Sequence, residues 1–112
     1  MTPWLPLLIA LFSEPAITMH LNPAYHAFEP VDVTVTVRAE PLASDRELHV
    51  VLDGPSFFRS TSYGLEGEQA PKTHRIAWRS VPAGEYQVIA SIGPPGRVRA
   101  RVIRELRILS RS

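Results

Sequence analysis

The chain has 112 residues, of which 45% are apolar, 21% charged and 8% aromatic. This length suits one domain with its own core, and the balance excludes a disordered or collagen-like chain. The 11 prolines against 6 glycines favour many short segments over a few long helices. The absence of cysteine excludes disulfides, thiolate metal sites and cysteine nucleophiles.

The N-terminus carries an apolar run at residues 4–12, which has neither the period of a strand nor a single helical stripe. The run is too short to span a bilayer, which takes about 20 residues. Its length fits the h-region of a secretory signal, with Ser13 or Ala16 as the small residue before cleavage. No Lys or Arg precedes the run and Pro6 interrupts it, so a first strand or helix in the core is the alternative. We expect residues 1–16 to be a signal peptide and the protein to be secreted or periplasmic, without a transmembrane segment after cleavage.

From residue 17 onward, apolar and polar residues alternate with the period of half-buried strands. The clearest case is residues 31–38, where four valines share one face and four polar residues share the other. Similar alternation occurs at residues 17–22, 48–52, 75–79, 85–92 and 97–102, and a weaker strand is expected between Phe57 and Leu65. About seven short strands predict an all-β fold, a single antiparallel β-sandwich over residues 17–109, followed by a tail at 110–112.

The inward phase of these strands defines the expected core. It comprises Val33, Val35, Val37, Leu48, Val50, Leu52, Ile76, Trp78, Tyr86, Val88, Ala90, Val98 and Ala100. If Ile92 and Val98 both point inward, their connecting loop must hold an odd number of residues, either 93–95 or 93–97. Residues 102–109 also fit one face of a helix, but we expect one long final strand with a bulge near Arg104.

Three segments carry a resemblance to a known family. The strand from Pro30 to Arg38, the internal Trp78 and residues 82–88 (Pro-Ala-Gly-Glu-Tyr-Gln-Val) resemble bacterial immunoglobulin-like or fibronectin type III-like domains. The resemblance implies an immunoglobulin-like sandwich in which Tyr86 closes a corner by hydrogen bonding to the main chain. The chain lacks the cysteine pair of antibody domains, and Trp78 falls in a late strand. Trp78 and Tyr86 are accordingly expected to be structural residues.

No motif predicts catalysis or metal binding. The four histidines (His20, His26, His49 and His74) lack the spacing of paired metal ligands, and no nucleophile elbow or glycine-rich phosphate loop occurs. Glu66 and Glu68 are interpreted as a solvated acidic turn, since a calcium loop needs more oxygen ligands. We therefore expect no enzyme, no metal and no cofactor, and no nucleic acid as a partner.

The first candidate binding surface is the segment 54–64. It carries Phe57, Phe58 and Tyr63 among hydroxyl residues, a composition that can stack on a sugar or anchor a protein contact. Alternatively, one phenylalanine completes the core and the rest is an edge strand, because adjacent strand residues point to opposite faces.

The second candidate surface is a row of arginines near the C-terminus. Residues 97–112 carry six arginines and one glutamate, whereas residues 1–96 are net acidic. Arg97, Arg99 and Arg101 alternate on one expected strand face at intervals of about 7 Å. Such a row either keeps an edge strand from pairing with other chains or binds an acidic partner.

These observations favour a non-catalytic exported binding or structural module that contacts another protein, with an acidic partner as the option that the arginines suggest. The alternative is a carbohydrate-binding accessory domain that holds a glycan with Phe57, Phe58 and Tyr63.

The expected export can be tested on the mature protein. Cleavage after Ser13 removes residues 1–13 from the 112 and leaves 99. Mass spectrometry of the secreted product should then show a chain without the apolar run. A soluble cytoplasmic product that keeps Met1 or Trp4 would contradict the prediction.

Overall fold

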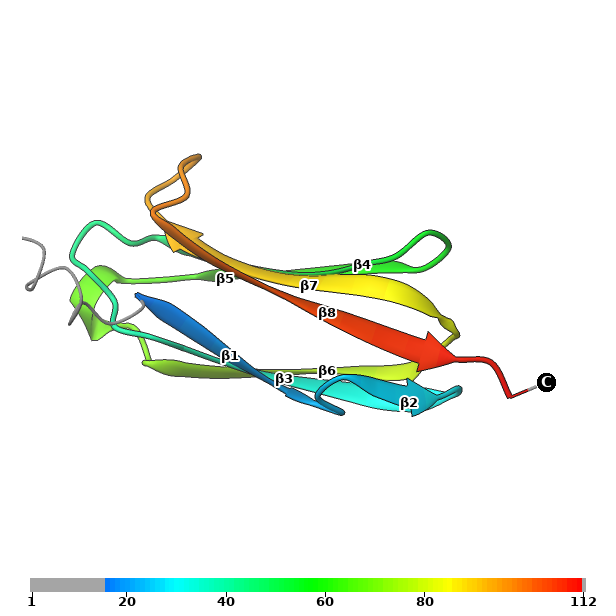
Figure 1. Ribbon diagram of the computed structural model, residues 1–112. Helices are drawn as coiled ribbons and strands as arrows, with labels where there is room; N and C mark the ends of the chain where they lie inside the picture. The colour runs from blue at the N-terminus through cyan, green and yellow to red at the C-terminus, as the bar shows by residue number, and fades with distance from the viewer. Residues whose placement is uncertain (1–15, 112) are drawn as a thin grey trace, which may run out of the picture.

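The computed structural model describes residues 16–111, which form two facing β-sheets (Figure 1). The elements in chain order are β1 (Ile17–Asn22), β2 (His26–Phe28), β3 (Val31–Ala39), β4 (Glu47–Asp53), β5 (Phe58–Gly64), the short 3-10 helix η1 (Gly67–Gln69), β6 (Thr73–Val81), β7 (Gly84–Gly93) and β8 (Ala100–Leu109). One sheet has the order β1-β3-β6, and the other has the order β2-β8-β7-β4-β5. The predicted all-β sandwich is confirmed.

The apolar run at residues 4–12 lies outside the described residues. Within residues 16–111, no helix has the length and hydropathy needed to cross a membrane.

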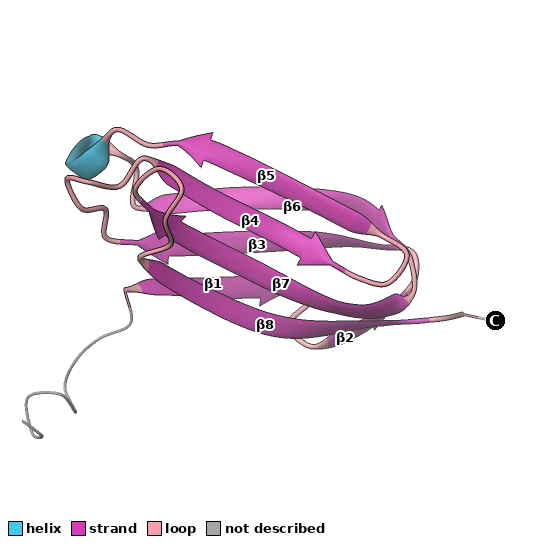
Figure 2. Ribbon diagram, turned by 90° about the horizontal axis from the view of Figure 1, so that it is seen from above, coloured by secondary structure: helices cyan, strands magenta, loops and turns pink. Residues whose placement is uncertain are grey.

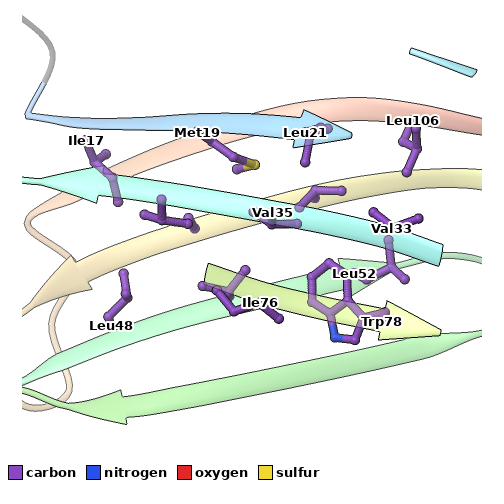
Figure 3. Packing of buried hydrophobic residues seen from close by; sticks show 14 of the residues in the cluster. Ile17, Met19, Leu21, Val33, Val35, Leu48, Leu52, Ile76, Trp78 and Leu106 are labelled. Carbon is purple, nitrogen blue, oxygen red and sulfur yellow. The ribbon is translucent and has the colours of Figure 1, made fainter. Parts of the chain in front are cut away.

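The core lies between the two sheets and is built from the inward phase of each strand. Val33, Val35 and Val37 of β3 are fully buried, and each such burial contributes about 1.5–3 kcal/mol relative to exposure. Figure 3 shows side chains from both sheets filling the space between them, with Trp78 at one end. The predicted core is confirmed except at its C-terminal part, where Ala100 is half-buried and Val98 is 49% exposed.

Residues 16–111 form eight strands rather than about seven. The additional strand, β2, has three residues and pairs in parallel with the end of β8, so the sandwich is not wholly antiparallel. Three residues are too few to show a period, and prolines lie on either side at positions 23 and 30. Sequence periodicity therefore had no means of detecting this strand.

The final strand is continuous, which corrects the expected bulge near Arg104. Strands β7 and β8 keep one unbroken antiparallel register from the Gly84–Ile108 pair to the Ile92–Ala100 pair. Arg104 occupies the inward phase of β8, where it pairs with Val88, yet it is exposed. A side chain that alternation places on the core-facing side of β8 can therefore still be exposed.

The loop between β7 and β8 is longer than either expected length. Ile92 pairs with Ala100, so an odd number of residues separates the two partners, as the parity argument required. The loop places the Arg97 carbonyl against the α-carbon of Gly93 and leaves no room for a side chain there. Gly96 has open space around it but takes a φ of +69°, in the left-handed region that favours glycine. Val98 belongs to this loop, which explains its exposure.

Tyr86 forms a corner between β6 and β7. Its ring is 2% exposed, and its hydroxyl donates a 2.8 Å hydrogen bond to the main-chain carbonyl of Pro82. The ring of Phe57 meets it edge-on, with centroids 6.3 Å apart. Burial, with a smaller contribution from the Glu29 carboxylate, raises the pKa of the Tyr86 hydroxyl, so this group stays a hydrogen-bond donor at neutral pH.

Tyr86→Phe should destabilise the protein while leaving its fold intact. The substitution removes one hydrogen bond, which is worth about 0.5–1.5 kcal/mol. Urea denaturation should report this loss as a lower midpoint with an unchanged slope. Tyr25→Phe is the matched control because Tyr25 is 78% exposed. An equal effect at both positions would contradict the role of the corner.

Candidate functional site

A buried ion pair anchors one end of the sandwich. Asp45 is fully buried in the connection from β3 to β4, and Arg99 lies in the loop before β8. Arg99 Nη2 is 2.7 Å from Asp45 Oδ2, and Arg99 Nε donates to Asp45 Oδ1 at 3.0 Å. The main-chain N–H of Leu42 also donates to Asp45 Oδ2 at 2.7 Å. The carboxylate thus has partners on both oxygens, which compensates for its burial.

The two charged groups stabilise each other's ionised forms. The hydrogen bonds from Arg99 hold the pKa of Asp45 below its usual value, against the opposing effect of burial. The Leu42 N–H lowers the pKa of Asp45 further. The carboxylate in turn raises the pKa of Arg99.

This pair changes the interpretation of the arginine row. Arg97 and Arg99 precede β8 in the loop, and only Arg101 belongs to the strand. Arg97 and Arg101 are exposed, whereas the Arg99 side chain is 21% exposed and engaged with Asp45. The structure therefore does not assemble the three arginines into one strand face, and Arg99 contributes little free charge for a partner.

The aromatic segment is also divided. Phe57 packs inward against Tyr86 and has the Arg59 guanidinium 4.2 Å from its ring centroid. Phe58 is 55% exposed on the outer face of the five-stranded sheet. Tyr63, at the far end of β5, is half-buried with the His74 ring 5.1 Å away. These three rings do not form a common stacking surface.

The outer face of the three-stranded sheet groups two arginines with three threonines. We call this set, Thr18, Thr36, Arg38, Thr73 and Arg75, the basic face. The strand register places Arg38 between Thr18 and Thr73, and Arg75 beside Thr36. Arg38 and Arg75 are therefore diagonal neighbours on adjacent strands, a relation that separates positions by about 7–8 Å. Neither arginine takes part in an ion pair within residues 16–111.

An open cleft adjoins the basic face at the same end of the sandwich as the buried ion pair. It has a volume of about 620 Å³. Thr18 and Arg38 line it from the sheet, and Glu40, Leu42 and Arg99 line it from the loops. Glu40 is 3.1 Å from Lys72 Nζ, so its charge is countered by that lysine. Arg38 is the cation of this cleft that lacks an ion-pair partner among the described residues.

Metal binding has no evident location in the described part of the chain. No three side chains of the types His, Cys, Asp or Glu gather there in a position to hold an ion. His20, His26 and His49 lie on separate strands, and His74 packs against Tyr63.

Comparisons with known proteins show solved structures of similar fold but do not assign the chain to a family. No protein-family model matches the sequence, and no curated protein matches it. A substituted form of superoxide reductase (neelaredoxin) from Ignicoccus hospitalis has a similar structure, with a TM-score of 0.60 over 90% of this chain and 86% of that one, at 10% identity. Superoxide reductase (neelaredoxin) from the same organism has a TM-score of 0.58 over 84% and 80%, also at 10% identity. Murine CRIg has a TM-score of 0.39, which carries no argument.

These neighbours correct two predictions. The chain was expected to be a non-catalytic binding or structural module and not an enzyme, but the solved structures that share its fold at these scores are enzymes. The inference from the absence of catalytic motifs to a non-catalytic role therefore fails. At 10% identity the likeness shows the fold alone, so superoxide reduction is not transferred to this chain. The described residues offer no cluster through which such a step could be derived.

Sequence reasoning did not identify Asp45, Arg38 or Arg75 as site residues. Asp45 sits in a loop without a motif, and its partner Arg99 is 54 positions away. Arg38 and Arg75 were each placed on the outward phase of a strand, which is correct. The missing information was that β3 and β6 are neighbours, because nothing in a single sequence reports strand order.

The contribution of the buried ion pair to the free energy of unfolding should decrease at acid pH. The folded-state pKa of Asp45 is lowered, so the pair contributes in full above the unfolded pKa of about 3.9 and is lost as pH falls through the folded value. Asp45→Asn leaves Arg99 without its counter-ion and should cost about 3 kcal/mol at pH 7. Urea denaturation should show a clearly smaller cost at pH 3.

Glu40→Gln provides the control for that experiment. Glu40 also pairs with a cation, but both side chains are well exposed, so the change should stay below about 1 kcal/mol. An Asp45→Asn cost that is the same at both pH values would rule out the charge as its source.

Proposed function

We propose that this protein binds a small acidic ligand with two anionic groups across the basic face and the adjoining cleft. The observation that carries the proposal is the pair Arg38 and Arg75, two exposed guanidinium groups on adjacent strands without a carboxylate partner in the described chain. A guanidinium presents a planar set of donors that matches a carboxylate or phosphate, so unpaired arginines in register suit such groups.

The neighbouring side chains favour the same ligand chemistry. Thr36 and Thr73 place hydroxyl groups beside the two arginines, and these groups can donate to anionic oxygens, whereas the Thr18 hydroxyl donates to the Arg38 carbonyl. The nearby carboxylate of Glu40 is already paired with Lys72 and so repels an anion less. The spacing of about 7–8 Å between the two arginine positions suits a ligand with two anionic groups rather than one.

The cleft beside Arg38 supports a ligand of limited size. Its volume of about 620 Å³ is within the range of small-molecule sites. Leu42, which is 46% exposed, supplies an apolar contact at its edge. The proposal concerns binding and holds equally for a ligand and for a substrate.

The immunoglobulin-like relationship is part of this proposal. It is supported by the Tyr86 corner after the Pro82-Ala83-Gly84 turn and by the two-sheet architecture. The apolar run near the N-terminus supports a location outside the cytoplasm, where the basic face would meet its ligand in solution.

Calorimetric titration with linear dicarboxylates of increasing length tests the proposal. Dicarboxylates whose charges can reach both arginines should bind, and matched monocarboxylates should bind more weakly. Arg38→Gln and Arg75→Gln should each reduce the affinity roughly tenfold, the loss of one charge-assisted hydrogen bond. Binding should also weaken at high salt, where the Debye length falls to about 3 Å.

Arg101→Gln is the control because it removes the same charge from the opposite sheet. It should leave the affinity unchanged. If Arg101→Gln weakens binding as much as Arg38→Gln does, the attraction is due to overall charge and the proposed site is wrong.

A further inference from the structure

The outer face of the five-stranded sheet carries an apolar row that nothing in residues 16–111 covers. Val51 of β4 pairs with Ile89 of β7, which pairs with Ile103 of β8. All three point away from the core, because the residues before and after them along β4 and β7 are buried. Val51 and Ile89 are partly exposed, and Ile103 is 45% exposed. Figure 2 looks onto this face and shows the connecting loops at its ends.

The positions flanking the apolar row carry opposite charges on its two sides. One register step towards the β7–β8 loop lie His49, Ser91 and Arg101. One step in the other direction lie Asp53, Gln87 and Glu105. Each strand thus has opposite or complementary polar groups at equal distances from the row: His49 and Asp53 on β4, Ser91 and Gln87 on β7, and Arg101 and Glu105 on β8.

This arrangement is complementary to itself about one axis. A two-fold rotation about the apolar row turns a second copy face down and exchanges the two sides. Arg101 of one chain then lies opposite Glu105 of the other, and His49 lies opposite Asp53, while the three apolar residues meet their own copies. A two-fold axis along the strands would instead place Glu105 opposite Asp53, which brings two carboxylates together. The charges therefore select the first axis.

We infer that this face is a docking surface for a second copy of the same chain, joined by the apolar row and oriented by Arg101 and Glu105. Face-to-face packing of two sheets at a small angle is a common arrangement. Three strands about 4.8 Å apart, with three outward positions about 7 Å apart on each, give a contact of roughly 15 Å by 20 Å. An interface of this size is at the small end for proteins, so the dimer is weak, with a dissociation constant on the order of 10–100 µM.

Charge reversal tests both the contact and its axis. Arg101→Glu places a new carboxylate opposite Glu105 at both ends of the symmetric contact, and Glu105→Arg places two guanidinium groups together. Sedimentation velocity across the expected concentration range should show a dimer for the unchanged full chain and monomers for each single variant. The affinity should fall at least tenfold in each case.

Two recombinations give a result that no general loss of stability can produce. An equimolar mixture of the Arg101→Glu chain and the Glu105→Arg chain should form a heterodimer, because every charge then faces an opposite one. The chain with both substitutions should dimerise with itself for the same reason. Unchanged denaturation midpoints establish that the single variants are folded.

A control pair with equal charge changes elsewhere excludes simple attraction between acidic and basic chains. Arg79→Glu and Glu68→Arg change exposed residues outside this face. Each of these chains should dimerise as the unchanged chain does, and their mixture should show no added affinity. The proposal is overturned if the unchanged chain stays monomeric throughout, or if the mixture of the Arg101 and Glu105 variants remains monomeric.

Discussion

The buried carboxylate of Asp45 organises one end of this sandwich. It lies where the chain leaves the three-stranded sheet and enters the five-stranded one, and Arg99 reaches it from the start of β8. The adjacent main chain is fixed as well, since the Arg46 N–H donates to the Gly93 carbonyl and the Gly67 N–H donates to the Asp45 carbonyl. The Asp45 side chain and the main chain of residues 45–46 together thereby connect β4, β7, β8 and the 3-10 helix. Leu42 and Arg99, which line the cleft, are held in position by their hydrogen bonds to Asp45.

The same contact explains why charge density in the sequence was a poor guide to the proposed binding surface. The C-terminal segment holds half of the basic residues, but one of them, Arg99, is used to neutralise Asp45. The free guanidinium groups of the basic face come from β3 and β6, which the sequence shows as ordinary amphipathic strands. What distinguishes Arg38 and Arg75 is that they are diagonal neighbours on adjacent strands, and that is a property of the folded chain.

Period-2 alternation was sufficient to predict most strands and their buried faces. β3 shows the reason. Its valines share one face, so burying the polar face instead would be far less favourable, and this fixes both the register and the side that points to the core. Alternation failed where the chain leaves the ladder, as at Val98, whose phase matched a strand that begins two residues later. Alternation also carried no information on strand order. The basic face and the apolar row both depend on which strands are neighbours. The prediction that the chain is not an enzyme rested on the absence of local motifs, and it is overturned by the solved enzymes that share the fold.

Gly93, the last residue of β7, and Gly96, in the loop that follows, are fixed by different constraints. At Gly93 the obstacle is space, because the Arg97 carbonyl occupies the volume that any β-carbon would need. At Gly96 the obstacle is handedness, because the space is open but the backbone takes a positive φ. A synthetic chain with a D-alanine at position 96 would fit this backbone without strain, since the mirror-image residue prefers that conformation. An L-residue at position 93 would displace the loop, and with it the guanidinium that neutralises Asp45.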